Sequence, residues 1–464
     1  MMYNPSQLQY SLVLLFFFLS SDTLSFLLFQ TRHRSPTPFN NKFSSPSCIS
    51  STVLSAKKIQ FLISDTGGGH RASALSLSSS ISKLNPEVIC DVVDVYTTYG
   101  NVFPFKDYPE LYKFMTSFAD GILWRWFYEG GETELGILTN RILTEIFCRD
   151  SFKECLSRVG YNRSPSVKDG PEDYVIPPCG GSRADMVVSV HPLTQDLPLK
   201  LCSELDSSDG HRTPFVTVCT DLGSASRSWF HQGADCIVVP TKVLEDKAKL
   251  VCRQGAAGHD GGRVKRIGLP IRPEFMPTKT KAEYKADAGV DEGKPMVLVV
   301  GGGDGMGGIV ETAKAVVAAA KRDGGTVVVV CGSNKEAKGN LEAEYGASGG
   351  VKVLGYTTEM ATYMNAADVL VTKGGPGTIA EAACVGVATV ISSFLPGQEE
   401  GNVDFVSDGG WGGFIDNNEG IGEEVGRLLR DDGERKRRGE KAKKMGRGEA
   451  SDEIAKLLLD MLPA

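Results

Sequence analysis

The chain has 464 residues, of which 41% are hydrophobic and 23% are charged. A chain of this length and composition can bury a sizeable core in two or more domains, which excludes wholesale disorder. The 50 Lys and Arg residues against 57 Asp and Glu residues give a net charge of −7, which argues against nucleic acid as the main partner. The 11 cysteines include no C-x-x-C pair, so we expect unpaired thiols and no disulfide scaffold or zinc site.

Residues 1–57 have the composition of a targeting leader. Two apolar runs, Ser11–Ser20 and Leu24–Phe29, are each shorter than the ~20 residues that span a bilayer. The segment that follows is rich in Ser and in basic residues and contains no acidic residue before Lys58. This pattern is typical of a signal peptide joined to an organellar transit peptide, and we predict a disordered bipartite leader that directs the chain to a plastid. A plain signal anchor is the alternative. No later run is long enough for a transmembrane helix, so we expect the mature chain to be soluble or bound to a membrane surface.

Two series of short apolar strands alternate with helical segments after the leader. The first series covers 59–63, 88–95, 186–190, 215–218 and 236–239, and the second covers 296–300, 326–330, 351–354, 369–371 and 389–391. Such alternation predicts parallel sheets covered by helices on both faces. The proline-containing segment 268–273 suits a linker, so we predict an α/β protein with an N-terminal domain over 58–270 and a C-terminal domain over 271–464. Each half resembles a doubly wound Rossmann-like domain, and two such halves place a cleft between them. Gly160–Arg183 is polar and patternless, which suggests a surface insertion.

A glycine-rich turn follows the first strand and opens the first helix. Ser64–Arg71 reads S-D-T-G-G-G-H-R, which is neither a P-loop nor G-x-G-x-x-G. Gly68 and Gly69 allow close approach of a ligand to the backbone, and the helix start offers N–H groups to an anion. His70 at this junction is a candidate general base, with a simple helix-capping role as the alternative. Asp65 either orients the imidazole or caps the turn.

Three glycine-bearing turns follow strands of the second series. They are Gly301–Gly308, which contains Gly302 and Gly303, then Lys373–Glu381, and then Phe394–Asn402. Turns at the carboxyl edge of one parallel sheet form a basin for a nucleotide diphosphate, with the amides of Gly377 and Thr378 facing phosphate. Glu381 is placed to accept ribose hydroxyls. Packing of helices on strands is the alternative reason for these glycines.

Several motifs together resemble the monogalactosyldiacylglycerol synthases of plastids. They are S-D-T-G-G-G-H-R-A-S-A, S-V-H-P-L, V-T-V-x-T-D-L, R-S-W-F-H, G-L-P-I-R-P-E-F, G-G-G-D-G-M-G, G-P-G-T-I-A-E-A and P-G-Q-E-E-G-N. The resemblance runs from about Lys58 to the carboxyl end. It implies a glycosyltransferase B fold of family 28, related to the bacterial peptidoglycan N-acetylglucosaminyltransferase. It also implies UDP-galactose as donor, 1,2-diacylglycerol as acceptor and inversion at the anomeric carbon.

The resemblance assigns roles to individual positions. His70 matches the essential histidine of the glycine loop, and Arg272 matches the linker arginine near the donor phosphates. The donor-binding turns match Gly377, Thr378, Ile379, Ala380, Glu381, Gln398, Glu399, Glu400, Gly401, Asn402 and Val403, with a carboxylate near Glu399 on the galactose hydroxyls. Asp304, Gly374 and Glu400 depart from the expected Glu, Ala and Lys, and the change at Glu400 reverses a charge beside the donor.

These assignments define an expected mechanism. His70, with Asp65 as its possible orienting partner, takes the proton of the acceptor hydroxyl while UDP leaves from the opposite face. No D-x-D motif occurs, so Arg272 and helix amino termini are expected to neutralise the diphosphate, and neither a metal nor another cofactor is predicted.

The acceptor requires contact with a bilayer. Phe105, Trp124 and Trp126 lie among basic residues, a mixture that favours an anionic lipid interface, although such rings also serve as domain core. Trp229 and His231 are weaker candidates for contacts in the cleft. We expect peripheral association with a plastid envelope or thylakoid membrane, activation by an anionic lipid such as phosphatidylglycerol, and a possible homodimer.

Other functions remain open at this stage. A diacylglycerol glucosyltransferase differs from the favoured activity in its sugar alone, and another family-28 UDP-sugar transferase is a further alternative. A nucleotide-sugar epimerase needs no lipid-facing aromatic residues. A non-catalytic nucleotide-sugar-binding subunit needs neither the His70 loop nor all three donor turns.

Overall fold

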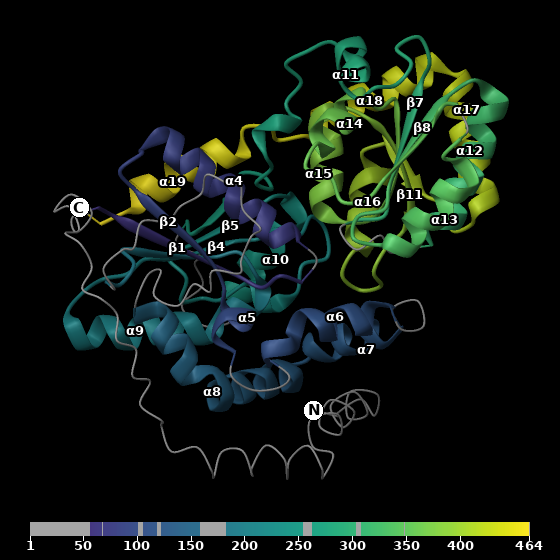
Figure 1. Cartoon of the computed structure of the whole chain (residues 1–464). Helices are drawn as coiled ribbons and strands as arrows, with labels where there is room; N and C mark the ends of the chain where they lie inside the picture. Colours follow the sequence, from purple (N-terminus) through teal and green to yellow (C-terminus); the bar gives the residue numbers. More distant parts are fainter. Residues whose placement is uncertain are drawn as a thin grey trace, which may run out of the picture.

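The computed structural model describes residues 56–66, 68–100, 105–117, 122–157, 182–253, 262–302, 308–347 and 349–463. These residues form two α/β lobes that lie side by side, each around its own sheet (Figure 1). The predicted leader, apart from its last two residues, lies outside the described residues, as does nearly all of the predicted insertion Gly160–Arg183.

The N-terminal lobe is built on a six-stranded sheet in which all strands are parallel. Its order is β2-β1-β3-β4-β5-β6. The strands are β1 (Lys58–Ile63), β2 (Ile89–Asp94), β3 (Met186–Ser189), β4 (Phe215–Val218), β5 (Cys236–Val239) and β6 (Val264–Arg266). Ile59 of β1 pairs with Cys90 of β2 on one side and with Met186 of β3 on the other. Every residue of β1 is buried, Lys58 and Gln60 included, because helices cover both faces of the sheet.

Helices surround this sheet and extend from one side of it. They are α4 (Gly69–Leu84), α5 (Val95–Tyr99), α6 (Tyr108–Ser117), α7 (Ile122–Gly131), α8 (Glu134–Ser157), α9 (Asp196–Asp209) and α10 (Lys242–Arg253). Between β2 and β3, helices α6, α7 and α8 pack in sequence and form a helical layer at the bottom of the lobe in Figure 1. This layer extends under the C-terminal lobe.

The C-terminal lobe repeats the architecture with sheet order β12-β11-β10-β7-β8-β9. Its strands are β7 (Met296–Val300), β8 (Thr326–Val330), β9 (Val351–Leu354), β10 (Val369–Lys373), β11 (Ala388–Ser393) and β12 (Gly412–Phe414). Its helices are α11 (Lys281–Asp287), α12 (Ile309–Asp323), α13 (Lys335–Tyr345), α14 (Met360–Ala366), α15 (Pro376–Val385), α16 (Glu400–Asp408), α17 (Asn418–Arg430) and α18 (Asp432–Met445). All pairings are parallel. The predicted fold of two doubly wound α/β domains is confirmed.

The last helix returns to the N-terminal lobe. Helix α19 (Ala450–Met461) packs against α4, and its Ile454 and Leu458 are buried with Leu77 of that helix (Figure 1). Ser76 of α4 and Ser451 of α19 both donate hydrogen bonds to the carbonyl oxygen of Ile271, at 2.6 and 2.8 Å. The linker between the lobes is therefore held by both helices, although the sequence placed all of 271–464 in the C-terminal domain.

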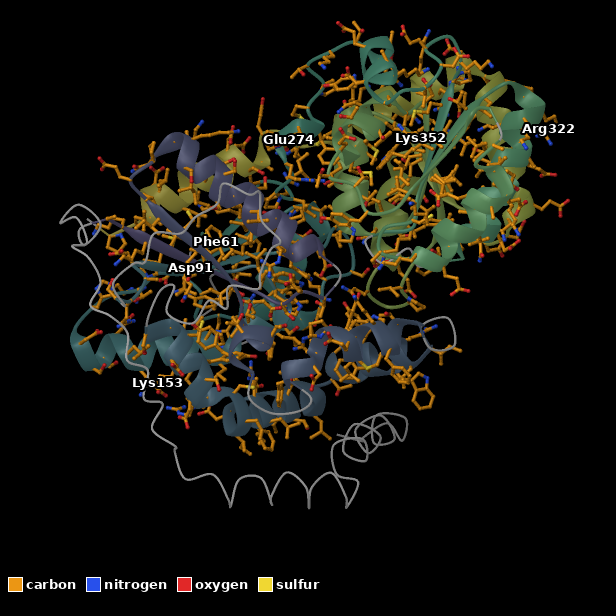
Figure 2. All side chains as sticks on the ribbon, in the orientation of Figure 1. Phe61, Asp91, Lys153, Glu274, Arg322 and Lys352 are labelled. Carbon is orange, nitrogen blue, oxygen red and sulfur yellow. The ribbon has the colours of Figure 1, made fainter. Side chains whose placement is uncertain are left out.

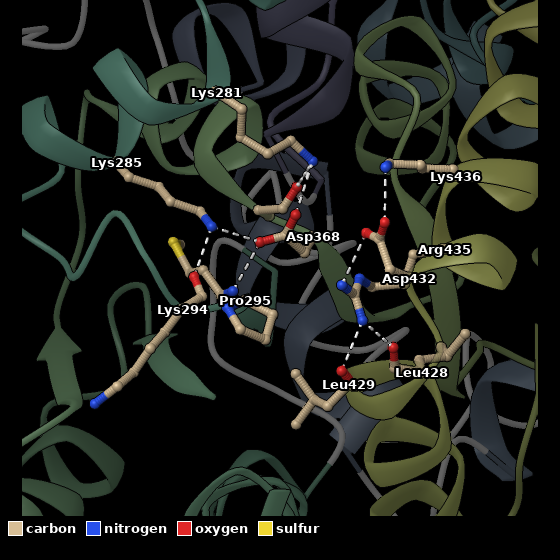
Figure 3. Close-up of polar contacts among 12 residues, drawn as sticks. Lys281, Lys285, Lys294, Pro295, Asp368, Leu428, Leu429, Asp432, Arg435 and Lys436 are labelled. Carbon is tan, nitrogen blue, oxygen red and sulfur yellow. Dashed lines mark hydrogen bonds and ion pairs between the residues drawn. The ribbon is translucent and has the colours of Figure 1, made fainter. Parts of the chain in front are cut away.

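Buried side chains and polar contacts hold each lobe together. Phe61 is fully buried in the N-terminal lobe, whereas Arg322 lies at the outer edge of the C-terminal lobe (Figure 2). At one end of the C-terminal sheet, Asp368 accepts a hydrogen bond from the Met296 amide at 2.8 Å and pairs with Lys285 (Figure 3). Arg435 donates a hydrogen bond to the carbonyl oxygen of Leu429 at 2.7 Å. This bond gives a partner to one of the carbonyl groups at the C-terminal end of α17.

Candidate active site

The glycine turn after β1 presents the start of α4 to open space. Gly68 has φ 73°, a left-handed conformation that residues with a Cβ rarely adopt. A Cβ atom at Gly68 or Gly69 would meet nothing within 4 Å. The amides at this helix start therefore border a region that a polar substrate can enter.

His70 lies in the first turn of α4, and residues that follow β3 and β4 contact its ring. Its Nδ1 is 2.9 Å from the Thr220 Oγ1, and its ring meets the His191 ring edge-on with centroids 4.5 Å apart. Burial lowers the pKa of His70 to about 4, while a hydrogen bond with the Val190 backbone and the charge of Asp65 act in the opposite direction. At neutral pH the imidazole is therefore uncharged, and one of its ring nitrogens carries a lone pair, although burial disfavours the protonated form.

Asp65 does not orient His70 directly. Its carboxylate accepts two hydrogen bonds from the Nε of Arg71, at 2.8 and 3.1 Å. Within the described residues no hydrogen bond joins Asp65 to His70. The hydroxyl that contacts the imidazole belongs to Thr220, which lies just beyond the end of β4. Thr220 was not predicted as a site residue, although its place after a strand of the parallel sheet is a signal for one.

A buried carboxyl group lies next to Thr220. Asp221 is 4% exposed and accepts a hydrogen bond from the Trp229 Nε1 at 2.7 Å. Burial raises the pKa of Asp221 to about 7, and the charge of Glu399 from the other lobe acts in the same direction. Trp229 is fully buried and has its ring centroid 6.0 Å from that of His70. His231, by contrast, pairs with Asp196 in a separate cavity.

An apolar cavity opens beside His70. Its volume is about 140 Å³, and its wall includes His70, His191 and Asp221 together with Gln398 from the C-terminal lobe. The aromatic part of the wall comes from α5 to α7 and the turn before α6, namely Tyr96, Phe105, Tyr108, Tyr112, Trp124, Phe127 and Tyr128. A mainly apolar lining that includes a few polar groups, such as His70 and Asp221, suits a ligand with a polar head and an apolar body.

The three aromatic residues predicted to contact acceptor or membrane fall into two groups. Phe105 and Trp124 are 7% and 6% exposed and line the cavity, so their rings do not lie on the outer surface. Trp126 is 48% exposed. The difference follows from the periodicity of α7, because residues two positions apart in a helix point in different directions.

Arg272 and Glu381, predicted on the donor side, lie next to each other. The Arg272 Nη2 is 3.3 Å from a carboxylate oxygen of Glu381, and the guanidinium lies 4.8 Å from the Phe275 ring centroid. Burial raises the pKa of Glu381 to about 7, and Arg272 opposes the shift. The Arg272 Nε is buried without a hydrogen-bond partner among the described residues, so this cation retains donor capacity for a ligand.

The remaining predicted positions on α15 are at or near its start. The helix begins at Pro376, and a Cβ at Gly377 would meet nothing within 4 Å, so its amino end borders open space. Thr378 and Ala380 are partly exposed. Ile379 is fully buried in the core of the lobe, so only its backbone can serve a ligand.

Lys373 and Glu399 lie where the donor turns converge. The Lys373 Nζ is 3.0 Å from a Glu399 oxygen, and a Cβ at Gly302 would lie 3.3 Å from the Lys373 side chain. Glu399 is 4% exposed and also accepts a hydrogen bond from the Leu395 amide at 2.8 Å. Lys373 was not predicted as a site residue, although it ends β10 at the carboxyl edge. Gly303 lies outside the described residues.

The start of α16 carries the other predicted positions and touches the N-terminal lobe. Asn402 is fully buried and donates to the Gly374 carbonyl at 2.8 Å, while its Oδ1 accepts from the Gly223 amide at 3.2 Å. Gly401 lies against Gly223, where a Cβ would be 2.1 Å from the Gly401 carbonyl oxygen. Glu400 is exposed and Val403 packs on the core. These residues thus join the two lobes at the site.

Neither a metal-binding cluster nor a membrane-spanning helix occurs in the part of the chain that the structure describes. No group of three or more His, Cys, Asp or Glu side chains there is placed to hold a metal ion. None of the helices there has both the length and the apolar character to cross a bilayer.

Family models match two segments of the chain. Residues 180–271 match "Monogalactosyldiacylglycerol (MGDG) synthase", and residues 280–445 match "Glycosyl transferases group 1". Monogalactosyldiacylglycerol synthase 1, chloroplastic, of Arabidopsis thaliana is 33% identical over 368 residues, which cover 77% of this chain and 62% of that protein. Synthase 3, chloroplastic, of the same plant is 33% identical over 365 residues, which cover 77% and 71%. The chain therefore spans less than two thirds of the first of these relatives.

Solved structures share the fold at low identity. The Acinetobacter baumannii MurG structure is 14% identical in sequence, with a TM-score of 0.51. The match covers 87% of this chain and 100% of the MurG chain. Medicago truncatula UGT71G1, complexed with UDP-glucose, is 13% identical with a TM-score of 0.53, covering 88% and 99%. At these identities the likeness shows the two-lobed fold alone.

Proposed function

This chain belongs to the family of monogalactosyldiacylglycerol synthases, and we propose that it transfers galactose from UDP-galactose to the free hydroxyl of 1,2-diacylglycerol. The observation that carries the proposal is the position of His70. Its neutral imidazole lines a cavity with many aromatic side chains that also reaches Gln398 of the opposite lobe. The cavity suits an apolar acceptor with one reactive hydroxyl, and the turns of the C-terminal lobe suit a nucleotide sugar.

The reaction is a single displacement with inversion. His70 takes the proton of the acceptor hydroxyl, the oxygen attacks the anomeric carbon, and the bond from that carbon to the diphosphate oxygen breaks. General-base help of this kind is typically worth ~10²–10⁴ in rate. Thr220 orients the imidazole through its contact with Nδ1. Asp65 acts on His70 only through its charge, since its carboxylate is bonded to Arg71.

Cations and amides of the C-terminal lobe receive the leaving diphosphate. Arg272 pairs with Glu381 in the second turn of α15, and Lys373 lies beside Gly302 at the converging turns. The amides at the start of α15, from Gly377 onward, add a partial positive charge. These groups supply the charge that a divalent cation supplies in other transferases, so we propose that no metal cofactor is required. Glu381 is proposed to bind the ribose hydroxyls, and Glu399 those of galactose.

Exposed apolar side chains follow one face of α8, in the same helical layer that lines the cavity. They are spaced three or four residues apart and are 43%, 51%, 49% and 65% exposed, at Leu135, Leu138, Ile142 and Ile146. Side chains at this spacing share a helix face. We propose that this face lies on the bilayer and that the acceptor enters the cavity from it, as expected for a peripheral protein of a plastid membrane.

Product formation with three donors tests the proposal. The full chain is incubated with vesicles that contain 1,2-diacylglycerol and with UDP-galactose, UDP-glucose or UDP-N-acetylglucosamine, and the lipid product is identified by mass spectrometry and by its anomeric proton signal. We expect β-linked monogalactosyldiacylglycerol from UDP-galactose alone. Faster turnover of UDP-glucose would show that glucose, not galactose, is the sugar transferred. Release of free sugar without a lipid product would overturn the proposed transfer to diacylglycerol.

A further inference from the structure

The loop between β11 and α16 is held by a helix pair of the other lobe. We call residues 394–399 the donor loop and the pair α6–α7 the hairpin. Leu395 of the donor loop is 7% exposed, although it lies between secondary-structure elements, because it packs in a cluster with Tyr112, Met115 and Trp124 of the hairpin. A loop side chain buried by another lobe is positioned by that lobe rather than by its own sheet.

Tyr128 of the hairpin adds a second connection to the donor loop. Its hydroxyl donates to the Ser224 carbonyl at 2.6 Å, and its ring lies so close to Gly397 that a Cβ there would be 2.9 Å from the ring. The Ser224 hydroxyl in turn donates to the Gln398 carbonyl at 3.0 Å and accepts from the Gly401 amide at 2.7 Å. The backbone on both sides of Glu399 is therefore fixed by the N-terminal lobe.

The same loop carries the carboxylate that we assign to the donor. Glu399 accepts a hydrogen bond from the Leu395 amide at 2.8 Å and pairs with Lys373 at 3.0 Å. A shift of Leu395 thus moves the partner of Glu399 and, through it, the charge beside Lys373. The position of this buried ion pair depends on the hairpin, because an ion pair with little solvent is sensitive to small changes in geometry.

The exposed side of the hairpin carries large apolar side chains among charged ones such as Lys113 and Arg125. Phe114, Ile122 and Trp126 are 53%, 57% and 48% exposed. Together with the exposed face of α8 they provide aromatic and aliphatic side chains that suit the interface of a bilayer. One helix pair therefore carries the donor-loop cluster on one face and lipid-compatible side chains on the other.

We propose that the hairpin couples membrane contact to donor binding: a bilayer that fixes the hairpin also fixes the donor loop, so the protein binds UDP-galactose more tightly on a membrane than in solution. The inference rests on the proposed function, since that function places the sugar at Glu399. Leu395 and Tyr128 act as positioning residues here. Because coupling between two binding sites is reciprocal, UDP-galactose should also strengthen binding to vesicles by the same factor.

Donor affinity measured with and without a bilayer tests the coupling. The full chain is titrated with UDP-galactose by calorimetry, alone and with vesicles of phosphatidylcholine and phosphatidylglycerol that contain no diacylglycerol, so that no acceptor is present. We expect the vesicles to lower the Kd of the wild-type protein by about fivefold or more. Leu395→Ala should abolish this response while the protein still sediments with the vesicles, and Leu395→Met should restore it because the cluster is refilled.

Matched controls separate coupling from general destabilisation. Leu341→Ala removes the same side chain from a fully buried position in α13 of the same lobe and should keep the vesicle response. An unchanged Kd of the wild-type protein on vesicles would overturn the inference, as would a Leu395→Ala response equal to the wild-type one or a lost response in Leu341→Ala. Galactosyl transfer to diacylglycerol, assayed in parallel, reports on the proposed function separately, since turnover can persist without coupling.

Discussion

The Nδ1 of His70 and the Oγ1 of Thr220 lie 2.9 Å apart although 150 residues separate them in the chain. The contact joins the first turn of α4 to the segment after β4 and fixes the direction of the imidazole. Thr220 is 4% exposed, so few other groups can replace its hydroxyl. Orientation of a general base matters because a small misplacement from the reacting atoms slows proton transfer strongly.

Replacing Thr220 by Val should lower kcat by about ten- to hundredfold while the KM for UDP-galactose stays nearly constant. Val keeps the shape of the side chain but leaves the imidazole without its hydroxyl partner. Thr220→Ser retains the hydroxyl and should keep most of the activity. Steady-state kinetics on vesicles that contain diacylglycerol provide the measurement, and a wild-type kcat in Thr220→Val would contradict the assigned role.

The buried carboxyl of Asp221 should make stability depend on pH. Its pKa is about 7 in the folded protein and 3.8 as the ordinary value, so the folded chain holds a proton that the unfolded chain releases between these values. The free energy of unfolding therefore falls as pH rises through this window. Asp221→Asn cannot titrate, so its stability relative to wild type should improve with rising pH, by at most roughly 4 kcal/mol in total.

Calorimetric melting of both proteins from about pH 5 to about pH 8 measures this difference. The control Asp416→Asn, at an exposed position, should show a difference that does not grow with pH. A constant gap between Asp221→Asn and wild type over the whole range would show that Asp221 is ionised throughout.

The contact between Gly223 and Gly401 should be intolerant of any side chain. A Cβ at Gly223 would lie 2.1 Å from the Gly401 carbonyl oxygen, so Gly223→Ala must push the start of α16 away from the N-terminal lobe. We expect the KM for UDP-galactose to rise about tenfold or more, because Glu399 lies directly before this helix. Gly339→Ala, where a Cβ meets nothing within 4 Å on α13, should leave the KM unchanged. Equal KM values for the two variants would contradict a role of the contact in donor binding.

Negative charges introduced on the exposed face of α8 should make the enzyme use diacylglycerol in a bilayer less efficiently. Ile142→Glu and Ile146→Glu place carboxylates at positions that are 49% and 65% exposed, where they would enter the lipid interface. The apparent KM for diacylglycerol in vesicles should rise severalfold, whereas kcat with a short-chain diacylglycerol dissolved in water should not change. Leu250→Glu, at a 60% exposed position on α10, is the matched control. A similar rise in that variant would argue against α8 as the membrane face.

The strands were largely predictable because parallel strands covered on both faces are continuous apolar runs. The predictions for β4, β5, β7, β8 and β9 agree with the observed bounds, whereas the three-residue edge strands β6 and β12 were missed. A three-residue segment at a sheet edge carries too little apolar pattern to be distinguished from a loop. The packing of α19 on α4 was also missed, because an amphipathic helix does not specify which lobe it covers.

The candidate site was predictable in part. The turns that follow strands predicted the neighbourhood of His70 and Glu399, since strand ends of a parallel sheet share one edge. Arg272, in the linker, was predicted from the family resemblance. The partners of these side chains were not predictable: Thr220 rather than Asp65 contacts His70, and Lys373 pairs with Glu399. Such pairings depend on the relative position of segments far apart in sequence, and local patterns carry no information on that.

The most direct test of the central claim is the effect of His70→Ala on single-turnover transfer of galactose from UDP-galactose to diacylglycerol, with UDP affinity measured on the same preparation. We predict that the rate constant of transfer falls by about 10²–10⁴ while the Kd of UDP stays within about twofold of wild type. An unchanged rate constant would contradict His70 as the base, and an equal loss of UDP binding would assign it to the donor site instead.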